Sequence, residues 1–493
     1  METVISIRPL IAVLASLLVI PLLAASKRSP NLREAWTLAA AVLKFLVVAS
    51  MLPLVLGGAQ FAYTIAPVLP GYPLQLRVDA LGILFALVSS SLWMVTSLYS
   101  IGYMRGLQEH AQTRYYCFFA LSLSATVGVA FSANLLTLYL FYEILSLSTY
   151  PLVTHHQDSE ARSSGRKYLF FILGTSICMV LPAMIFIANK TGTLEFASQG
   201  IAAGRIEPQT TTILVLLFIF GFAKAAIMPF HAWLPAAMVA PTPVSALLHA
   251  VAVVKVGVFC IIRMLTNIFG TELLTDLGMS TLICTIAACT VLVSSMIALS
   301  QDGLKRRLAF STIGQLSYIV LGVALLSQSG MVGGMLHIAM HAFGKITLFF
   351  CAGAIFVGAG VKNISQMTGI GKRMPFTMTA FFIGSLSVIG LPPCGGFISK
   401  WHLVIGTVEA GQFVMLAVLL FSSLLNAAYF LPIVYRAFFC RPEESLFTGP
   451  VDEAPTWCLV PPLLTAALSI VLFFYPQPFL QLAQQAVRGI LGG

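Results

Sequence analysis

The chain has 493 residues, of which 58% are hydrophobic and 9% charged, and its mean hydropathy is +0.94. Such a sequence has too little polar surface to cover a water-soluble globule, which excludes a soluble enzyme or binding domain. The formal net charge of +10 would suit a nucleic-acid-binding protein, so the position of the basic residues decides what that charge means.

Long apolar runs recur along the whole chain. A membrane-spanning helix needs about 20 apolar residues to cross about 30 Å of hydrocarbon, and the sequence offers about fourteen such runs. The runs are too long and too uniformly apolar for barrel strands, which alternate in polarity. We therefore expect an all-α integral membrane protein with spans that start near residues 4, 36, 79, 114, 134, 166, 211, 241, 278, 308, 331, 375, 411 and 456.

Basic residues concentrate in alternate loops between these runs. By the positive-inside rule such loops face the cytoplasm, so both termini face the outer side of a prokaryotic-type inner (cell) membrane. The positive charge then reflects membrane topology, and we expect no nucleic-acid partner. The loops after odd-numbered runs contain groups such as Lys27, Arg28 and Arg33; Arg162, Arg166 and Lys167; and Lys305, Arg306 and Arg307.

Little else in the sequence points to chemistry outside the spans. The basic cluster follows the first run rather than preceding it, so a cleaved signal peptide is not expected. The nine cysteines mostly fall within runs and lack paired metal spacing, which favours a packing role. The connections around residues 58–78, 190–210 and 438–455 are too short to bury a core. We expect no catalytic centre, metal or cofactor in this chain, so any redox chemistry would come from partner chains.

Three ionisable residues stand out in the first five runs. Lys44 lies within the second run without an evident partner, and Asp79 lies at the edge of the third; we interpret both as interface residues. Glu143, in the fifth run, is the only carboxylate squarely inside a long apolar run. A charge near a bilayer centre costs roughly 2.5 to 3.5 kcal/mol, so ionisable groups kept there are usually functional. Together with the lysines of later runs, Glu143 suggests proton transfer.

The seventh run combines a lysine with a helix break. Lys224 lies five residues before Pro229, whose ring removes a backbone hydrogen bond. A broken helix at membrane depth is tolerated where it lines a hydrated cavity, and its freed carbonyls can stabilise an ammonium group. Glu143 offers a counter-ion, and a movable carboxylate–lysine pair is a proton gate. The alternatives are a simple kink with a lysine that reaches the surface, or a static salt bridge.

The eighth and eleventh runs add histidines and further lysines. His249 and Lys255 share the eighth run, and His337, His341 and Lys345 recur at intervals of four in the eleventh. Residues at this spacing lie near one helix face, about 6 Å apart along the axis, where one water can bridge neighbours. Histidine titrates near neutrality, which favours a proton relay. The alternatives are a hydrogen-bonded core histidine or a metal site, although no cysteine or carboxylate lies nearby in sequence.

The twelfth run contains a second break. Pro392 and Pro393 interrupt it, and Lys400 follows seven residues later. Two proline-interrupted segments, five spans apart and each with a buried lysine, are expected of a transporter built from two five-helix repeats.

Several longer strings resemble one known family. PFHAWLP, APTPVSALLHAV, QDGLKRRLAFSTIGQLSY, HIAMHAFGK and GLPPCGGF look like the proton-translocating antiporter-like subunits. That family covers the large membrane subunits of respiratory complex I, the A- and D-type subunits of Mrp antiporters, and counterparts in membrane-bound hydrogenases. The resemblance runs from about residue 75 to residue 440. It implies inverted repeats of spans 4–8 and 9–13, with spans 7 and 12 discontinuous, and therefore units at 1–110, 111–265, 276–437 and 438–493, the last with a short amphipathic tail.

The resemblance also assigns roles to the buried groups. It implies that Glu143 and Lys224 form the pair of the first half, that Lys255 with the eleventh-run series forms a central axis, and that Lys400 is the terminal site of the second half. Two departures from the family pattern are visible. Ala236 replaces an aspartate common in the LPDA form of the WLP motif, and Gly344 stands where a bulky residue often precedes the lysine that corresponds to Lys345.

The sequence thus predicts a proton-translocating subunit of a multisubunit membrane complex. Lys400 and the KVGVF string at Lys255 look most like the Mrp D-type subunit, which implies a sodium/proton antiporter with protons and a monovalent cation as its ligands. The alternative is a proton-pumping subunit of a hydrogenase or complex I-like oxidoreductase. Two rivals from other classes are a self-sufficient organic-solute transporter, which would work as a single chain, and a purely structural assembly subunit.

Overall fold

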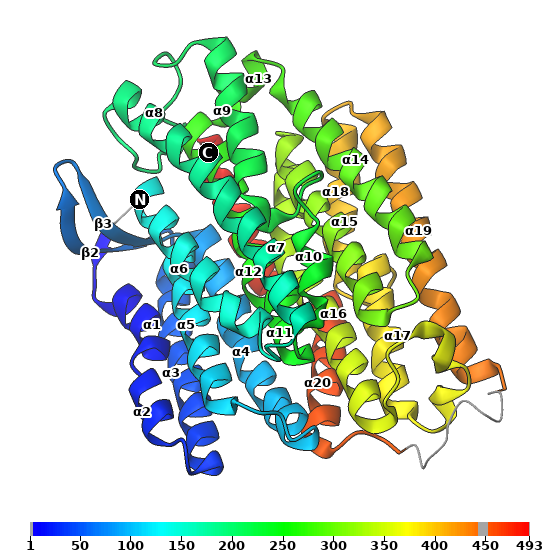
Figure 1. Ribbon diagram of the computed structural model, residues 1–493. Helices are drawn as coiled ribbons and strands as arrows, with labels where there is room; N and C mark the ends of the chain where they lie inside the picture. The colour runs from blue at the N-terminus through cyan, green and yellow to red at the C-terminus, as the bar shows by residue number, and fades with distance from the viewer. Residues whose placement is uncertain (1–2, 442–451, 493) are drawn as a thin grey trace.

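The computed structural model describes residues 3–441 and 452–492, and within them the chain is mostly helical (Figure 1). The first part contains α1 (Arg8–Leu17), α2 (Ile20–Ala25), α3 (Pro30–Leu56) and α4 (Ala80–Gly106). The middle contains α5 (Gln112–Ala130), α6 (Leu135–Val153), α7 (Ser159–Thr175), α8 (Leu181–Thr191), α9 (Pro208–Gly221), α10 (Trp233–Ala236), α11 (Thr242–Ala246), α12 (Val253–Arg263) and α13 (Thr271–Asp276). The last part contains α14 (Met279–Ser300), α15 (Leu304–Ala324), α16 (Gln328–Ala359), α17 (Pro375–Ile389), α18 (Gly396–Glu409), α19 (Phe413–Phe439), α20 (Thr456–Phe474) and α21 (Gln477–Leu491).

The expected membrane protein is confirmed at the level of its helices. In the described part of the chain, 11 helical segments are long and apolar enough to cross a membrane. The remaining three runs of the predicted set correspond to α5 and to the two interrupted segments, whose apolar helices α9 and α17 are short. Large apolar side chains on the outside of the bundle, such as Phe170, Leu424 and Phe474, are exposed, as contact with lipid tails requires.

The helical bundle carries one small element that the sequence analysis did not predict. A small sheet, in the order β1–β2–β3, is formed by β1 (Thr3–Ile5), β2 (Gln60–Leu69) and β3 (Tyr72–Val78). The first pair is parallel and the second is an antiparallel hairpin. Gly71, at φ +81°, makes the tight turn, and the flanking residues are rich in aromatic and β-branched types. The connection at residues 58–78 thus contains the sequence features of a β-hairpin, a glycine turn between two β-forming stretches.

Both predicted helix breaks are present. α9 ends at Gly221, eight residues before Pro229, and the chain then runs irregularly to α10, with Ala226 at φ +55°. α17 ends at Ile389, and α18 begins after a short break that contains Pro392 and Pro393. Counted from α5 in the first half and from α14 in the second, the broken segment follows three helical segments and precedes one more.

A third irregularity lies in the eighth segment, whose prolines, Pro241 and Pro243, stand only at the start of the run. Two wider π-helical turns, Leu247–Val251 and Met264–Phe269, flank α12, and Ala252 leaves the helical conformation at φ −127° and ψ −77°. This segment is wholly buried. Such π turns are often found at functional sites, because they change which side chains face a given direction.

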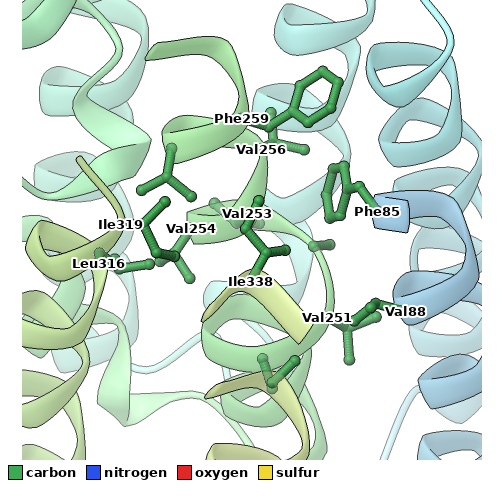
Figure 2. Packing of buried hydrophobic residues seen from close by; sticks show 14 of the residues in the cluster. Phe85, Val88, Val251, Val253, Val254, Val256, Phe259, Leu316, Ile319 and Ile338 are labelled. Atoms are coloured by element: carbon green, nitrogen blue, oxygen red, sulfur yellow. The ribbon is translucent and has the colours of Figure 1, made fainter. Parts of the chain in front are cut away.

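The helix α16 lies at the centre of the bundle. It packs against α4, α15, α17, α18, α20 and α21, so nearly all of its length is buried. Figure 2 shows the apolar packing beside it, where Val253 and Val256 of α12 lie between Phe85 of α4 and Ile319 of α15. The polar groups of α12 and α16 are therefore held inside a tightly packed protein core.

The C-terminal helix α21 behaves as the expected amphipathic tail. Its apolar face, which includes Leu482, Val487 and Ile490, is buried against α4 and α16. The side chain of Gln485 donates to the carbonyl of Val55 at the end of α3, next to the sheet that contains β1. The two ends of the described chain thus lie on the same side of the bundle. The expected loop 438–455 falls partly outside the described residues.

Candidate functional site

The amine of Lys224 is held by helix α6. Its Nζ donates to the carbonyl of Tyr142 at 2.8 Å and to Oγ of Ser146 at 2.6 Å. The same amine lies 3.0 Å from the centre of the Tyr142 ring, where the ring face attracts a cation. Because Lys224 is fully buried, these contacts replace the water that the amine loses.

Glu143 lies between the two α6 residues that hold Lys224, but it points elsewhere. Neither of its carboxylate oxygens, both of which are shielded from solvent, has a hydrogen-bond partner within the described residues. The carboxylate interacts electrostatically with Lys224, yet the two groups do not form an ion pair within 4.0 Å in the part of the chain described. Adjacent positions on a helix differ by about 100° in direction. The structure places Glu143 and Lys224 near each other, but their direct contact is not formed in this conformation, and the role of the pair stays a prediction.

The break around Lys224 depends on one glycine. A Cβ atom at Gly257 of α12 would lie 2.1 Å from the backbone nitrogen of Ala225 and 2.3 Å from the carbonyl carbon of Lys224. Only glycine lets the irregular segment pass this close to α12. The indole of Trp233 donates to the carbonyl of Ala223 at 2.8 Å, so one carbonyl freed by the break is satisfied.

The central feature of the site is a contact between Lys255 of α12 and His341 of α16. The amine faces Nδ1 of the imidazole at short hydrogen-bonding distance, and both side chains are buried. The other ring nitrogen of His341 has no partner among the described residues. An amine and an imidazole that face each other can share one proton, because each can act as donor or acceptor.

His337 continues this line towards the second half. Its ring stacks on that of His341 with centroids 5.6 Å apart. Its Nδ1 lies 2.8 Å from Oγ of Ser399, and its Nε2 lies 2.9 Å from Oε1 of Gln315. An amide oxygen can only accept, so Nε2 carries the hydrogen, and in the neutral ring Nδ1 is the nitrogen with the lone pair. The sequence did not single out Gln315 or Ser399, since neither residue type is unusual in a span.

Tyr318 connects His337 to Lys400. Its ring packs edge-on against the His337 ring at 5.9 Å, and the amine of Lys400 lies 4.7 Å from its centre. The amine donates to the carbonyl of Ile389 at 2.9 Å, which is the last residue of α17. A carbonyl freed at the end of the broken helix therefore holds the lysine. Gly390, at φ +89°, leaves room for the lysine stem, because a Cβ there would lie 2.5 Å from its Cδ.

Lys345 lies one turn beyond His341 on the same helix and is bound differently. Its amine donates to Oγ of Ser311 at 2.9 Å and to the carbonyl of Leu308 at 3.3 Å. The hydroxyl of Tyr429 also reaches Ser311, at 3.0 Å. Lys345 thus resembles Lys224 in its partners, since each amine is held by a serine and a carbonyl of a neighbouring helix.

A cavity of about 730 Å³, lined by both charged and apolar side chains, opens at the start of the eighth segment. It reaches Thr242 at the start of the eighth segment, and Ser245 and His249 follow at intervals of three and four residues. The hydroxyl of Ser245 and both ring nitrogens of His249 are buried without partners in the described structure. His249 stacks on Phe349 of α16, with ring centroids 4.6 Å apart. We refer to the cavity as the vestibule, and to Thr242, Ser245 and His249 as the inner row, of which Thr242 lines the vestibule and the other two lie deeper in the protein.

The two sequence departures have clear positions. Ala236 lines the vestibule, where Glu109, Asp158 and Glu160 also contribute, so acidic groups are present although the motif aspartate is not. Gly344 allows α17 to approach α16, since a Cβ there would lie 2.8 Å from Oγ of Ser387.

Lys44 and Asp79 both have partners within the chain. Lys44 is buried, and its amine donates to Ser16 at 2.6 Å and to the carbonyl of Leu123 at 2.9 Å. Asp79 caps α4 and forms two hydrogen bonds of 2.6 and 2.7 Å with the guanidinium of Arg263. Burial would raise the pKa of Asp79, but the charge and hydrogen bonds of Arg263 hold it below its ordinary value.

The buried lysines and histidines described above therefore form one line and two flanking sites. In the line Lys255, His341, His337, Tyr318 and Lys400, each group contacts the next, through a hydrogen bond, two ring contacts and a cation–π contact in that order. Lys224 and Lys345 are held separately, and no contact recorded for residues 3–441 and 452–492 joins the amine of Lys224 to that of Lys255.

Comparison with known proteins is consistent with this geometry. Residues 132–426 match the model of the membrane family described as "NADH:quinone oxidoreductase/Mrp antiporter, TM". NADH-quinone oxidoreductase subunit N of Desulforudis audaxviator is 34% identical over 77% of this chain and 76% of its own length. The A/B subunit of a probable K(+)/H(+) antiporter of Rhizobium meliloti is 32% identical over 86% of this chain, and Hydrogenase-4 component B of Escherichia coli is 31% identical over 84%. The match spans 42% and 64% of the length of these two relatives.

Two solved structures share the fold over nearly its whole length. A chain of the Mrp complex from Dietzia sp. DQ12-45-1b superposes with a TM-score of 0.88 at 23% identity, covering 98% of this chain and 97% of that one. A chain of the membrane-bound sulfane sulfur reductase, an archaeal respiratory membrane complex, also gives 0.88, at 26% identity, covering 99% and 98%. Both structures are described as complexes.

Proposed function

The chain belongs to the NADH:quinone oxidoreductase/Mrp antiporter membrane family, as a proton-translocating, antiporter-like subunit of a multisubunit membrane complex, and we propose that its protons pass along the line from Lys255 to Lys400. The observation that carries this proposal is the uninterrupted series of buried groups in which Lys255 faces His341, His341 stacks on His337, and Tyr318 lies between His337 and Lys400.

Protons enter this line through the vestibule. Basic residues such as Lys167, Lys305 and Lys362 surround it, so the positive-inside rule favours a cytoplasmic opening, with both ends of the chain on the outer side of an inner membrane. The inner row supplies a serine hydroxyl and an imidazole that lack protein partners within the described residues, as hydrated polar groups do. From His249 the proton moves to Lys255, on the same segment.

Glu143 and Lys224 act as the gate of the first half. In the present conformation Lys224 is bound to Tyr142 and Ser146, while Glu143 has no hydrogen bond to the described residues. If Lys224 rotated towards Glu143, its amine would lose the Tyr142 carbonyl and the Ser146 hydroxyl and gain a negatively charged carboxylate, which favours the protonated amine. Moving it back favours release of the proton. The acidic group thereby controls how readily Lys224 passes its proton to the central line.

For the surrounding complex we propose a Mrp-type monovalent cation (sodium)/proton antiporter, in which this chain is the D-type subunit. The lysine at position 400 and the string around Lys255 support it, as does the fold shared with a chain of a Mrp complex. The sodium ion would bind elsewhere, on a partner chain, because a single deep carboxylate is a poor ligand set for it. The 34% identity to the NADH-quinone oxidoreductase relative favours, as a second candidate, a proton-pumping subunit of a redox complex.

The test of the proton line uses lysine-to-methionine substitutions, which keep the length of the side chain and remove its charge. Lys400→Met in the assembled complex, reconstituted in vesicles, should lower proton flux by at least about 100-fold, the range of a lost proton-transfer group. Lys44→Met is the matched control, because that amine is equally buried and also bound to a serine and a carbonyl. Equal flux in the two variants would refute the proposal.

The same vesicles separate the candidate complexes. A sodium/proton antiporter moves protons in response to a sodium gradient alone, whereas a redox-driven pump requires an electron donor and acceptor. A solute carrier from a different class would take up its substrate as a single purified chain, and a purely structural subunit would retain flux in the Lys400→Met complex.

A further inference from the structure

Four side chains that the proton line does not use meet at the rim of the vestibule. Glu109 and His110 lie in the loop between α4 and α5, and His155 and His156 lie in the loop between α6 and α7. From these residues we propose a binding site for a divalent transition-metal ion of the zinc class, formed by the Glu109 carboxylate and the three imidazoles. The sequence expectation of no metal did not consider these loops, in which histidine and glutamate occur in adjacent positions.

The distances suit tetrahedral coordination. Oε2 of Glu109 lies 3.6 Å from Nε2 of His155, 3.8 Å from Nδ1 of His156 and 3.9 Å from Nδ1 of His110. The ligand atoms of Glu109, His110 and His156 all lie within 4.8 Å of one another. A tetrahedral zinc ion with bonds of about 2.0 to 2.1 Å holds its ligands about 3.3 Å apart. The distances from the Glu109 oxygen to the three imidazoles exceed this by a few tenths of an ångström, whereas the ligand atoms of the set, which lie up to 4.8 Å apart, must come closer by side-chain rotation.

Hydrogen bonding prepares one of these ligands. Nε2 of His110 lies 3.0 Å from the carbonyl of His155, which can only accept, so this nitrogen carries the hydrogen. In the neutral ring the lone pair is then on Nδ1, which faces Glu109. A histidine that binds a metal through one nitrogen and donates to a carbonyl through the other is the usual arrangement in such sites.

A second observation points to an absent ligand. His155 is fully buried, yet neither of its ring nitrogens has a hydrogen-bond partner within the described chain. A buried imidazole without a hydrogen bond is costly, and Nε2 lies 3.6 Å from Oε2 of Glu109, beyond hydrogen-bonding distance. Three nitrogens and one carboxylate suit zinc and related ions, whereas calcium and magnesium prefer oxygen ligands.

The position of the site gives it a consequence for transport, which rests on the proposed function. Glu109 and His156 line the vestibule, so an ion bound to them lies at its mouth and adds positive charge where protons enter. The bound ion should therefore slow proton entry without touching Lys255 or Lys400.

Binding is tested first, by titrating Zn²⁺ into the purified full-length chain and by recording the visible spectrum with Co²⁺. We expect one ion per chain and the intense absorption of tetrahedral Co²⁺. Glu109→Gln, His155→Gln and the more exposed His110→Ala should each weaken binding by at least about 10-fold, the loss seen even for groups that only orient a ligand. His402→Ala, on α18 and away from the vestibule, is the control and should bind as the parent chain does.

Proton flux in vesicles is then measured with and without Zn²⁺. We expect inhibition that a chelator reverses and that His110→Ala relieves. An absence of saturable binding, binding that none of the three substitutions weakens, or a weak octahedral Co²⁺ spectrum would each overturn the site. Because the titration requires no transport, loss of the proposed proton path leaves the binding result standing, and intact binding without inhibition would refute only the block of entry.

Discussion

The amine of Lys255 and the imidazole of His341 face each other across the interface of α12 and α16, and both are buried. Each helix belongs to a different half of the chain, so this contact is where the two halves exchange a proton in the proposed path. The other ring nitrogen of His341 has no hydrogen-bond partner among the described residues, so a substitution at either position leaves the remaining group without this contact.

His341→Gln should abolish proton flux while preserving the fold. Glutamine can still accept a hydrogen bond from Lys255 but cannot be protonated and pass a proton on. We expect a loss of at least about 100-fold in flux, measured in vesicles with a pH-sensitive dye. His402→Gln serves as control. A His341→Gln complex with parental flux would contradict a path through this ring.

Glu143→Gln should stop transport without lowering stability. Both carboxylate oxygens lack hydrogen-bond partners within the described structure, so removing the charge removes a desolvation cost. The variant should be as stable as the parent or more stable by up to about 1 kcal/mol, as judged from thermal unfolding in detergent. The exposed Glu207→Gln is its control. A clear fall in melting temperature would indicate that Glu143 has a structural partner.

Gly257→Ala should disturb the broken segment. The added methyl group would lie 2.1 Å from the backbone nitrogen of Ala225, and backbone cannot move aside as a flexible side chain can. We expect a destabilisation of about 1 to 3 kcal/mol or more, together with reduced flux, because Lys224 moves with its backbone. Gly174→Ala is matched to it, since a Cβ there meets nothing within 4 Å. That control should be neutral or slightly stabilising.

Asp79→Asn should change stability in a pH-dependent way. The folded-state pKa of Asp79 lies below the ordinary value of 3.8, because Arg263 outweighs the opposite effect of burial. The stabilisation is therefore fully present above that ordinary value and is lost as the pH falls through the lower folded-state pKa. The parent should exceed Asp79→Asn in stability by about 1 to 3 kcal/mol between about pH 5 and pH 8, the range for hydrogen bonds to charged groups.

Melting temperatures recorded from about pH 3 to pH 8 check this prediction. The difference between parent and Asp79→Asn should stay constant at neutral pH and shrink in acid. Asp276→Asn, at an exposed position, should follow the parent throughout. A difference that grows as the pH falls would have the wrong sign and would exclude the ion pair as its cause.

The sequence was most informative where a polar residue contradicts its surroundings. Lys224, Lys255, Lys345 and Lys400 could be recognised because apolar runs rarely contain lysine, and the two proline breaks because proline cannot continue a helix. All of these residues lie in the predicted segments, and all four lysines are buried. Their roles in proton transfer stay predictions.

Other parts of the site could not be predicted, since they depend on tertiary contact. Gln315, Tyr318 and Ser399 are ordinary residues for a span, and they become relevant only because three helices bring them beside His337 and Lys400. The rotation that separates Glu143 from Lys224 depends on the direction of each side chain around α6. His110 lies 45 residues before His155 in the sequence, and only the fold places His110, His155 and His156 together.

The irregular backbone between Thr242 and Phe269 makes the two sides of the Lys255–His341 contact differ in rigidity. α16 is a continuous helix enclosed by its neighbours, so displacing it would require repacking most of the bundle. The segment that carries His249 and Lys255 has two wide turns and an interrupted hydrogen-bond ladder, and can change its register at lower cost. Helix α16 is thus the fixed side of the contact, and the segment from Thr242 to Phe269 is the side that can shift. A conformational change in a neighbouring subunit would reach the contact through this segment.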